Sequence, residues 1–159
     1  MALRHIRKRD DLVLRRKAEP VRRFTPQLLQ LLDDMAETMI EADGAGLAAP
    51  QVGISKRVIV YRDENDVFEL INPVIVSSRG TAVDIEGCLS FPGLYGEVPR
   101  AEHVQATGLN REGKEIRLDV KGFLARVLQH EIDHLEGILF VDRATRLLTP
   151  AELEKLRQS

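Results

Sequence analysis

The chain has 159 residues, of which 43% are hydrophobic and 30% are charged, with a formal net charge of −2. This composition excludes a disordered chain and predicts one domain over residues 1–159. No apolar run approaches the ~18 residues that a membrane-spanning helix needs. Residues 1–23 hold nine Lys or Arg and three acidic residues. Because a targeting segment is poor in acidic residues, Asp10 and Asp11 indicate mature protein with no signal or transit peptide.

The first predicted element is a helix that begins at Thr25-Pro26 and runs to about Ala42. Threonine caps helices, proline suits the first turn, and one face carries only apolar residues: Leu28, Leu31, Leu32, Met35 and Met39. A segment rich in small residues, Gly44 to Gln51, follows. It lacks the Gly-Lys-Ser/Thr ending of a phosphate-binding loop, which excludes nucleotide binding. Gly46 instead predicts a close approach of the backbone to a ligand.

Short β-like runs follow, with turns predicted at residues 63–66, 79–80 and 110–113, and we expect antiparallel hairpins. A helix is then predicted over 123–136, and residues 149–152 match the capping box of a short last helix. This order predicts an α+β fold. Its antiparallel sheets pack around the 123–136 helix, with one helix near the N-terminus and a short one near the C-terminus.

The central helix carries the sequence His-Glu-Ile-Asp-His at 130–134. On a helix, His130 and His134 share one face, with Cβ atoms roughly 5–6 Å apart, so both imidazoles can bind one metal ion. Glu131 lies one step of about 100° round the helix and is placed to act as a general base. Val127 is on the same face. The helix should be largely buried because apolar residues recur at helical spacing: Phe123, Val127, Leu128, Ile132, Leu135 and Ile138.

A catalytic metal site of this kind needs a third protein ligand. Phe140 stands where a metzincin has its third histidine, which excludes that class. Glu154 has the spacing of the ligand in a thermolysin-like peptidase, and His103 is a further candidate without a supporting pattern. The stronger candidate is Cys88, the only cysteine, on a turn after a strand-like run. A non-catalytic metal-binding protein stays open as an alternative, and it would need neither Glu131 nor Gln51.

Three segments together resemble peptide deformylase: Gly-Ala-Gly-Leu-Ala-Ala-Pro-Gln at 44–51, Glu-Gly-Cys-Leu-Ser at 86–90, and Gln-His-Glu-Ile-Asp-His-Leu-Glu-Gly at 129–137. The resemblance implies a single catalytic domain that hydrolyses the N-formyl group of formylmethionyl peptides. Cys88, His130 and His134 would be the metal ligands and Glu131 the base. The side-chain amide of Gln51 and the backbone N–H of Leu89 would stabilise the oxyanion. Family members use Fe²⁺ in the cell and also work with Ni²⁺, Co²⁺ or Zn²⁺.

Further expectations concern the surroundings of the site. Glu86 and Arg100 are expected to form a pair that steadies the cysteine loop, and Val127 and Gly46 are expected to contact substrate. The basic N-terminal segment could make a transient contact with the ribosome. Specific DNA binding and membrane binding are not expected. The resemblance and the missing targeting segment imply a cytoplasmic, bacterial-type enzyme.

Overall fold

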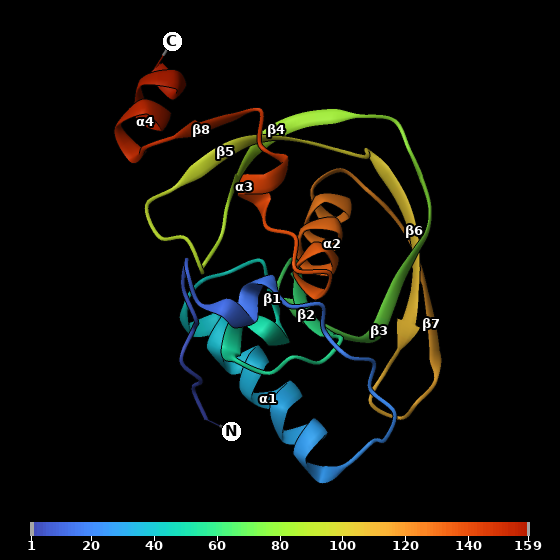
Figure 1. Ribbon diagram of the computed structural model, residues 1–159. Coiled ribbons are helices and arrows are strands. Elements are labelled where there is room, and N and C mark those ends of the chain that lie inside the picture. Colours follow the sequence, from blue (N-terminus) through green and yellow to red (C-terminus); the bar gives the residue numbers. More distant parts are fainter. Residues whose placement is uncertain (1, 159) are drawn as a thin grey trace.

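The computed structural model describes residues 2–158, and its two antiparallel sheets surround one central helix, α2 (Gly122–Leu135) (Figure 1). The larger sheet has the order β1-β2-β3-β6-β7, with strands Gly46–Ala48, Val58–Asp63, Asp66–Arg79, His103–Leu109 and Glu115–Lys121. The smaller sheet has the order β4-β5-β8, with strands Ala82–Gly87, Tyr95–Arg100 and Arg146–Leu148. This arrangement confirms the predicted α+β class with sheets around the central helix.

The two other predicted helices also lie close to their expected positions. Helix α1 spans Pro26–Glu41, and the hydroxyl of Thr25 accepts a hydrogen bond from the Leu28 N–H at 3.2 Å. Helix α4 spans Pro150–Gln158, where Thr149 and Glu152 form the reciprocal bonds of a capping box at 3.1 and 3.2 Å. Three short elements were not predicted: η1 (Leu12–Arg15), η2 (Ala49–Val52) and α3 (Phe140–Arg143).

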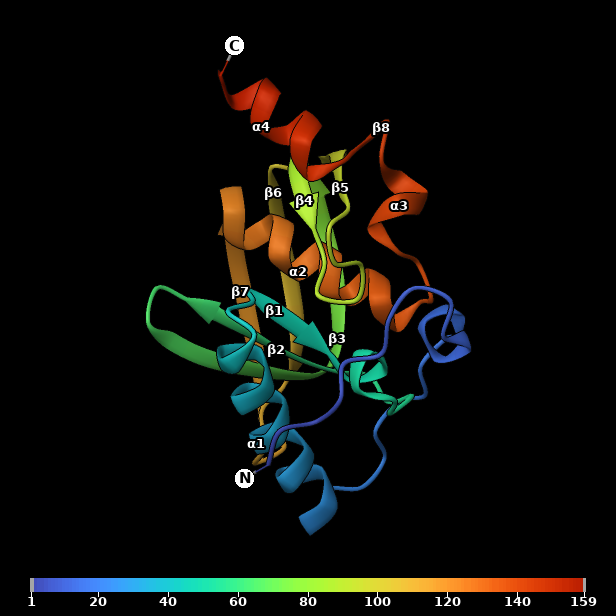
Figure 2. The same ribbon diagram turned by 90° about the vertical axis from the view of Figure 1, so that its left-hand side faces the viewer.

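The first four residues of β2 are buried on both faces because a helix covers each face. Val58 and Val60 pack in one hydrophobic cluster with the apolar face of α1, whereas Ile59 and Tyr61 pack with α2. Figure 2 shows β1 and β2 between the two helices. A strand covered on both faces is apolar throughout, as the Val-Ile-Val-Tyr run is. This packing places α2 against the segment that contains Gly46 and Gln51.

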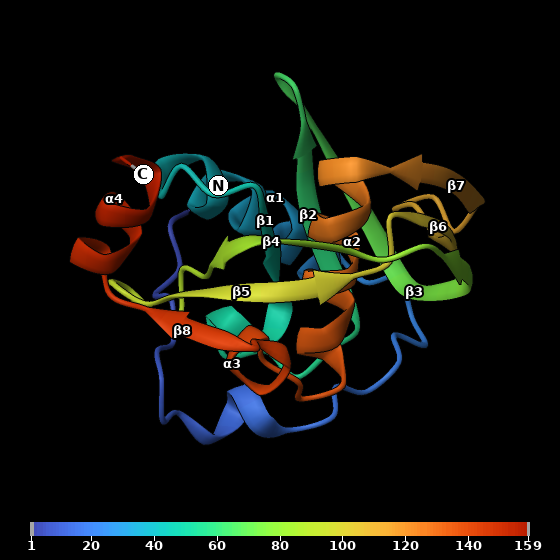
Figure 3. The ribbon, with the colours of Figure 1, turned by 90° about the horizontal axis from the view of Figure 1, so that it is seen from above.

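The turn at residues 79–80 is not the hairpin that we expected. β3 pairs with β2 and β6, while β4 pairs with β5, so this turn leads from the larger sheet to the smaller one. The 14-residue β3 contains two register shifts, and its far end leads into the strands that cross over α2 (Figure 3). Turn residues report a reversal of the chain, and the partner of the next strand depends on contacts distant in the sequence. The turns at 63–66 and 110–113 do connect paired strands.

Two residues of the predicted buried helix face lie outside the core. Ile138 follows the end of α2 at Leu135 and is only partly buried. Phe123 is 69% exposed, because it stands in the first turn of α2, before the helix passes between the sheets. Of the helices in residues 2–158, none has the length and apolar character needed to cross a membrane.

Candidate metal centre

Three candidate ligands meet between β4 and α2. Cys88 directly follows β4, and His130 and His134 lie one helical turn apart on α2. Their potential ligand atoms all lie within 4.8 Å of one another. The Cys88 Sγ is 3.4 Å from the His134 Nε2, and the two imidazole centroids are 5.1 Å apart. Both histidines are buried and Cys88 is partly buried, so one ion could contact all three from within the protein.

The chemistry of these donors fits a divalent transition metal. Thiolate sulfur and imidazole nitrogen are the ligands that zinc, iron, cobalt and nickel sites use, and three protein ligands leave one position open for water or substrate. Two buried polar atoms beside the cluster, His134 Nδ1 and Glu131 Oε1, have no hydrogen-bond partner among the described residues. Groups of this kind are costly to bury without a partner, which indicates a site that binds a metal ion, water or a ligand.

Glu86 orients His130. Its Oε1 is 2.9 Å from the His130 Nδ1, which leaves the Nε2 of that ring for a metal. Burial opposes the charged form of Glu86, but hydrogen bonds from His130 and Arg100 hold its pKa well below the ordinary range. Burial likewise opposes charge on His130, whereas Cys88 and Glu86 raise its pKa well above the usual value. His130 would have to be neutral to hold a metal ion, because imidazole binds metals in its deprotonated form.

Glu131 is a buried carboxyl group beside the cluster. Burial raises its pKa to about 7, so at neutral pH it can both accept and return a proton. Burial, together with the positive groups at His130 and Arg100, lowers the pKa of His134 well below its usual value. His134 is therefore neutral, the form in which imidazole binds metals.

Gln51 is held with its amide nitrogen toward the cluster. The Ala48 N–H donates to the Gln51 Oε1 at 3.0 Å, which fixes the orientation of the amide. The Gln51 Nε2 then donates to the Ser90 Oγ at 3.1 Å and to the Cys88 Sγ at 3.5 Å. Ser90 is fully buried. Leu89, the other predicted donor, lies between Cys88 and Ser90, so its backbone N–H belongs to the same turn.

A cavity of about 560 Å³ opens onto the cluster. Its walls include most of the residues predicted for the site: Gly46, Gln51, Glu86, Cys88, Leu89, Val127, His130 and Glu131. The structure therefore brings together the candidate ligands, the candidate base and the candidate pocket residues. His134 lies behind this wall with only 1% of its surface exposed.

Two alternative ligands lie elsewhere. Glu154 is exposed on α4, which lies well away from α2 (Figure 1), and its carboxylate accepts a hydrogen bond from Gln158. His103 lies on β6 and contacts Asp119 and Arg79. Neither belongs to the cluster of potential ligand atoms, so the geometry favours Cys88 over both.

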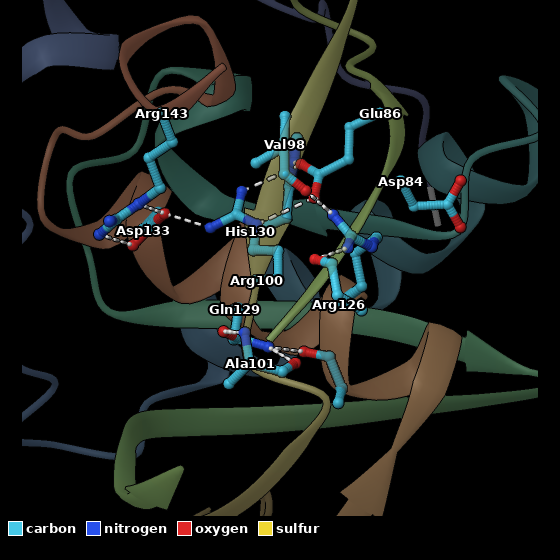
Figure 4. Close-up of polar contacts among 12 residues, drawn as sticks. Asp84, Glu86, Val98, Arg100, Ala101, Arg126, Gln129, His130, Asp133 and Arg143 are labelled. Carbon is cyan, nitrogen blue, oxygen red and sulfur yellow. Dashed lines mark hydrogen bonds and ion pairs between the residues drawn. The ribbon is translucent and has the colours of Figure 1, made fainter. Parts of the chain in front are cut away.

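Arg100 contacts Glu86, as we expected. Its Nε and one terminal nitrogen donate to the two Glu86 oxygens at 2.9 and 3.0 Å, and the other terminal nitrogen reaches the Asp133 Oδ2 at 2.5 Å (Figure 4). A second arginine, Arg126, also reaches Glu86, and sequence reasoning missed it. The available signal was its position four residues before His130, on the metal-facing side of a helix predicted to be buried.

A His-Glu-x-x-His helix, a cysteine donor and a buried carboxyl group define the class of metal-dependent hydrolases. A family model described as polypeptide deformylase matches residues 3–149. Peptide deformylase of Caldicellulosiruptor bescii is 51% identical over 157 residues, covering 99% of this chain and 95% of that protein. Peptide deformylase 1 of Bacillus cereus is 52% identical, covering 97% of this chain and 100% of that protein.

The structure of peptide deformylase from Thermotoga maritima superimposes with a TM-score of 0.89 at 41% identity, covering 92% of this chain and 100% of that one. The chain belongs to the peptide deformylase family, and it is a metal-dependent amide hydrolase.

Proposed function

We propose that this chain hydrolyses the N-formyl group from the formylmethionine of nascent polypeptides, with Cys88, His130 and His134 holding one divalent metal ion. The observation that carries this proposal is the meeting of the three donors within 4.8 Å at the wall of the cavity that also contains Glu131. When bound, such an ion lowers the pKa of water from 15.7 towards ~7 and so supplies a nucleophile at neutral pH.

Glu131 moves the proton. In the proposed reaction water adds to the formyl carbon, and the Glu131 carboxylate accepts the proton that the water loses. The C–N bond then breaks, and Glu131 returns the proton to the departing amine nitrogen, giving formate and a peptide with a free N-terminus. The burial that raises the pKa of Glu131 to about 7 suits a group that must perform both transfers.

Gln51 and Leu89 are assigned to the oxygen of the formyl group. That oxygen gains negative charge as water adds, and the Gln51 Nε2 and the Leu89 backbone N–H are the proposed donors to it. The bond from Ala48 supports this role because it fixes the Gln51 amide before substrate arrives. Val127 and Gly46, which line the cavity, are proposed to contact the methionine side chain and the substrate backbone.

The identity of the metal, a contact with the ribosome and the cellular compartment are also proposals. We infer Fe²⁺ as the metal used in the cell, with Ni²⁺, Co²⁺ or Zn²⁺ able to replace it, because a thiolate and two imidazoles accept all of these ions. A transient contact between the basic N-terminal segment and ribosomal RNA would suit an enzyme of nascent chains. We place the protein in a bacterial cytoplasm, where these chains are made.

The test is formate release from a formyl-Met-Ala-Ser peptide, with protein purified without air and reloaded with Fe²⁺ or Ni²⁺. Metal-dependent release that the Glu131→Ala variant loses would support the assignment. A Glu131→Ala variant that binds metal and retains full activity would overturn the role of Glu131. If the wild-type chain binds metal and releases no formate, the proposed reaction itself is wrong.

A further inference from the structure

Arg126 is a buried arginine that connects α2 with the β4–β5 hairpin. Its side chain is 8% exposed, and one terminal nitrogen donates to the Glu86 Oε2 at 2.6 Å and to the Val98 carbonyl at 2.8 Å. The other terminal nitrogen donates to the Ala82 carbonyl at 3.0 Å. Figure 4 shows the guanidinium group beside the Glu86 carboxylate. A planar guanidinium spreads five N–H donors over three nitrogens in a fixed fork, whereas a lysine has three donors on a single nitrogen.

These three acceptors span the hairpin. Ala82 begins β4, Glu86 stands near its end, and Val98 lies on β5 opposite Asp84. The strand continues beyond Glu86 through Gly87 to Cys88. Arg126 itself lies one turn of α2 before His130. A single side chain thus bonds the strand that leads to the cysteine ligand to the helix that bears both histidine ligands.

Arg126 also completes the surroundings of the Glu86 carboxylate. The Oε1 of Glu86 contacts His130 and Arg100, whereas the Oε2 contacts Arg100 and Arg126. Arg100 shares its charge with Asp133, which in turn contacts Arg143. Glu86 is the one acidic side chain that Arg126 contacts among the ion pairs of residues 2–158. Its charge is therefore directed at the carboxylate that orients His130.

We propose that Arg126 is a positioning residue of the metal centre, which holds Glu86 against His130 and holds the Cys88 turn at the distance that the two histidines require. This inference rests on the ligand set assigned above. Loss of Arg126 would remove one of the two arginine donors to the Glu86 Oε2 and one donor to each of two strand carbonyls inside the protein. The hairpin could then shift relative to α2, and the three ligands would no longer converge.

The experiment compares Arg126→Met with a matched control, Arg57→Met, in the full-length chain. Arg57 makes the same kind of contacts, to the carbonyls of Ala18 and Leu135 and to the carboxylate of Glu136, but it touches neither Glu86 nor a ligand side chain. Two measurements serve both variants. These are the Co²⁺ dissociation constant, from competition with a chelator, and the absorption band of the cobalt–thiolate bond. Thermal midpoints without metal report general damage to the fold.

We expect Arg126→Met to weaken Co²⁺ binding by ~10–100-fold and to shift the thiolate band, since loss of a group that supports a ligand typically has an effect of this size. Arg57→Met should lower the thermal midpoint and leave Co²⁺ affinity within about twofold of wild type, because it leaves the ligands in place. The proposal is overturned if Arg126→Met keeps wild-type affinity and band, or if both variants weaken Co²⁺ binding equally.

A second variant covers the case in which Arg126→Met does not fold. Arg126→Lys keeps the charge but can reach fewer acceptors, so it should still bind Co²⁺ about tenfold more weakly than wild type. Wild-type affinity in Arg126→Lys would refute the role of the guanidinium. Cys88→Ala tests the ligand set independently. The cobalt–thiolate band of wild type should be absent in Cys88→Ala, and if the two proteins have the same spectrum, the assignment of Cys88 fails. The comparison of the arginine variants addresses positioning alone.

Discussion

Gly46 gives Glu131 the space that its carboxylate occupies, and Gly46→Ala should therefore displace the proposed base. A methyl group at this position would lie 2.7 Å from the Glu131 Oε2 and 2.9 Å from its Cγ. Ordinary contact begins at 3.4 Å, so one of the two groups must retreat by ~0.7 Å. Because β1 is hydrogen-bonded to β2 and buried between two helices, we expect the Glu131 side chain to move.

The size of the effect follows from that displacement. A catalytic group misplaced by ~1 Å can cost ~10²-fold in rate, so we expect kcat/KM to fall by roughly 10–100-fold. The strain of overpacking should destabilise the fold by ~1–3 kcal/mol. The metal content should stay unchanged, since no ligand is touched. The assay is formate release from formyl-Met-Ala-Ser at saturating Ni²⁺, with metal content and thermal midpoint measured on the same samples.

Gly108→Ala is the matched control. Its added methyl would lie 2.5 Å from the Leu70 Cγ, so it also overpacks a buried region, but it touches no residue of the metal centre. We expect this variant to lose stability and to keep its kcat/KM. A folded Gly46→Ala protein with kcat/KM within about twofold of wild type would show that Glu131 need not occupy its observed place.

Three further predictions concern the proposed ligands and donors. Glu131→Gln should keep its metal and lose ~10²–10⁴-fold in kcat, the usual worth of a general base, and normal turnover with metal bound would contradict this. Gln51→Ala should lose ~10²–10³-fold in kcat with its metal retained; a rate change below about threefold would exclude it as an oxyanion donor. Removal of metal by a chelator should lower the thermal midpoint by about 5–11 °C if free metal had been ~100 times its dissociation constant, since that binding contributes ~2.7 kcal/mol. Cys88→Ala should abolish this difference, and a midpoint that still depends on metal in the variant would argue for another ligand.

The features that were predicted correctly depend on residues close together in the sequence. His130 and His134 are neighbours on any helix, and the cap at Thr25 needs only the next three residues. Cys88 was placed by the resemblance of its motif. The contacts of Arg126 with Ala82 and Val98 could not be foreseen, because they join residues 28 to 44 positions apart whose approach depends on the whole fold. The path of β3 from one sheet to the other escaped prediction for the same reason.

The ligands of the proposed centre come from two parts of the chain that approach only in the folded protein. Cys88 and His130 are separated by β5, β6 and β7, so the unfolded chain holds no preformed site. A bound ion would cross-link the β4–β5 hairpin to α2. Contacts that are completed late in folding slow unfolding more than they speed folding. The lifetime of the native state, rather than the rate at which it forms, should therefore respond to the supply of metal.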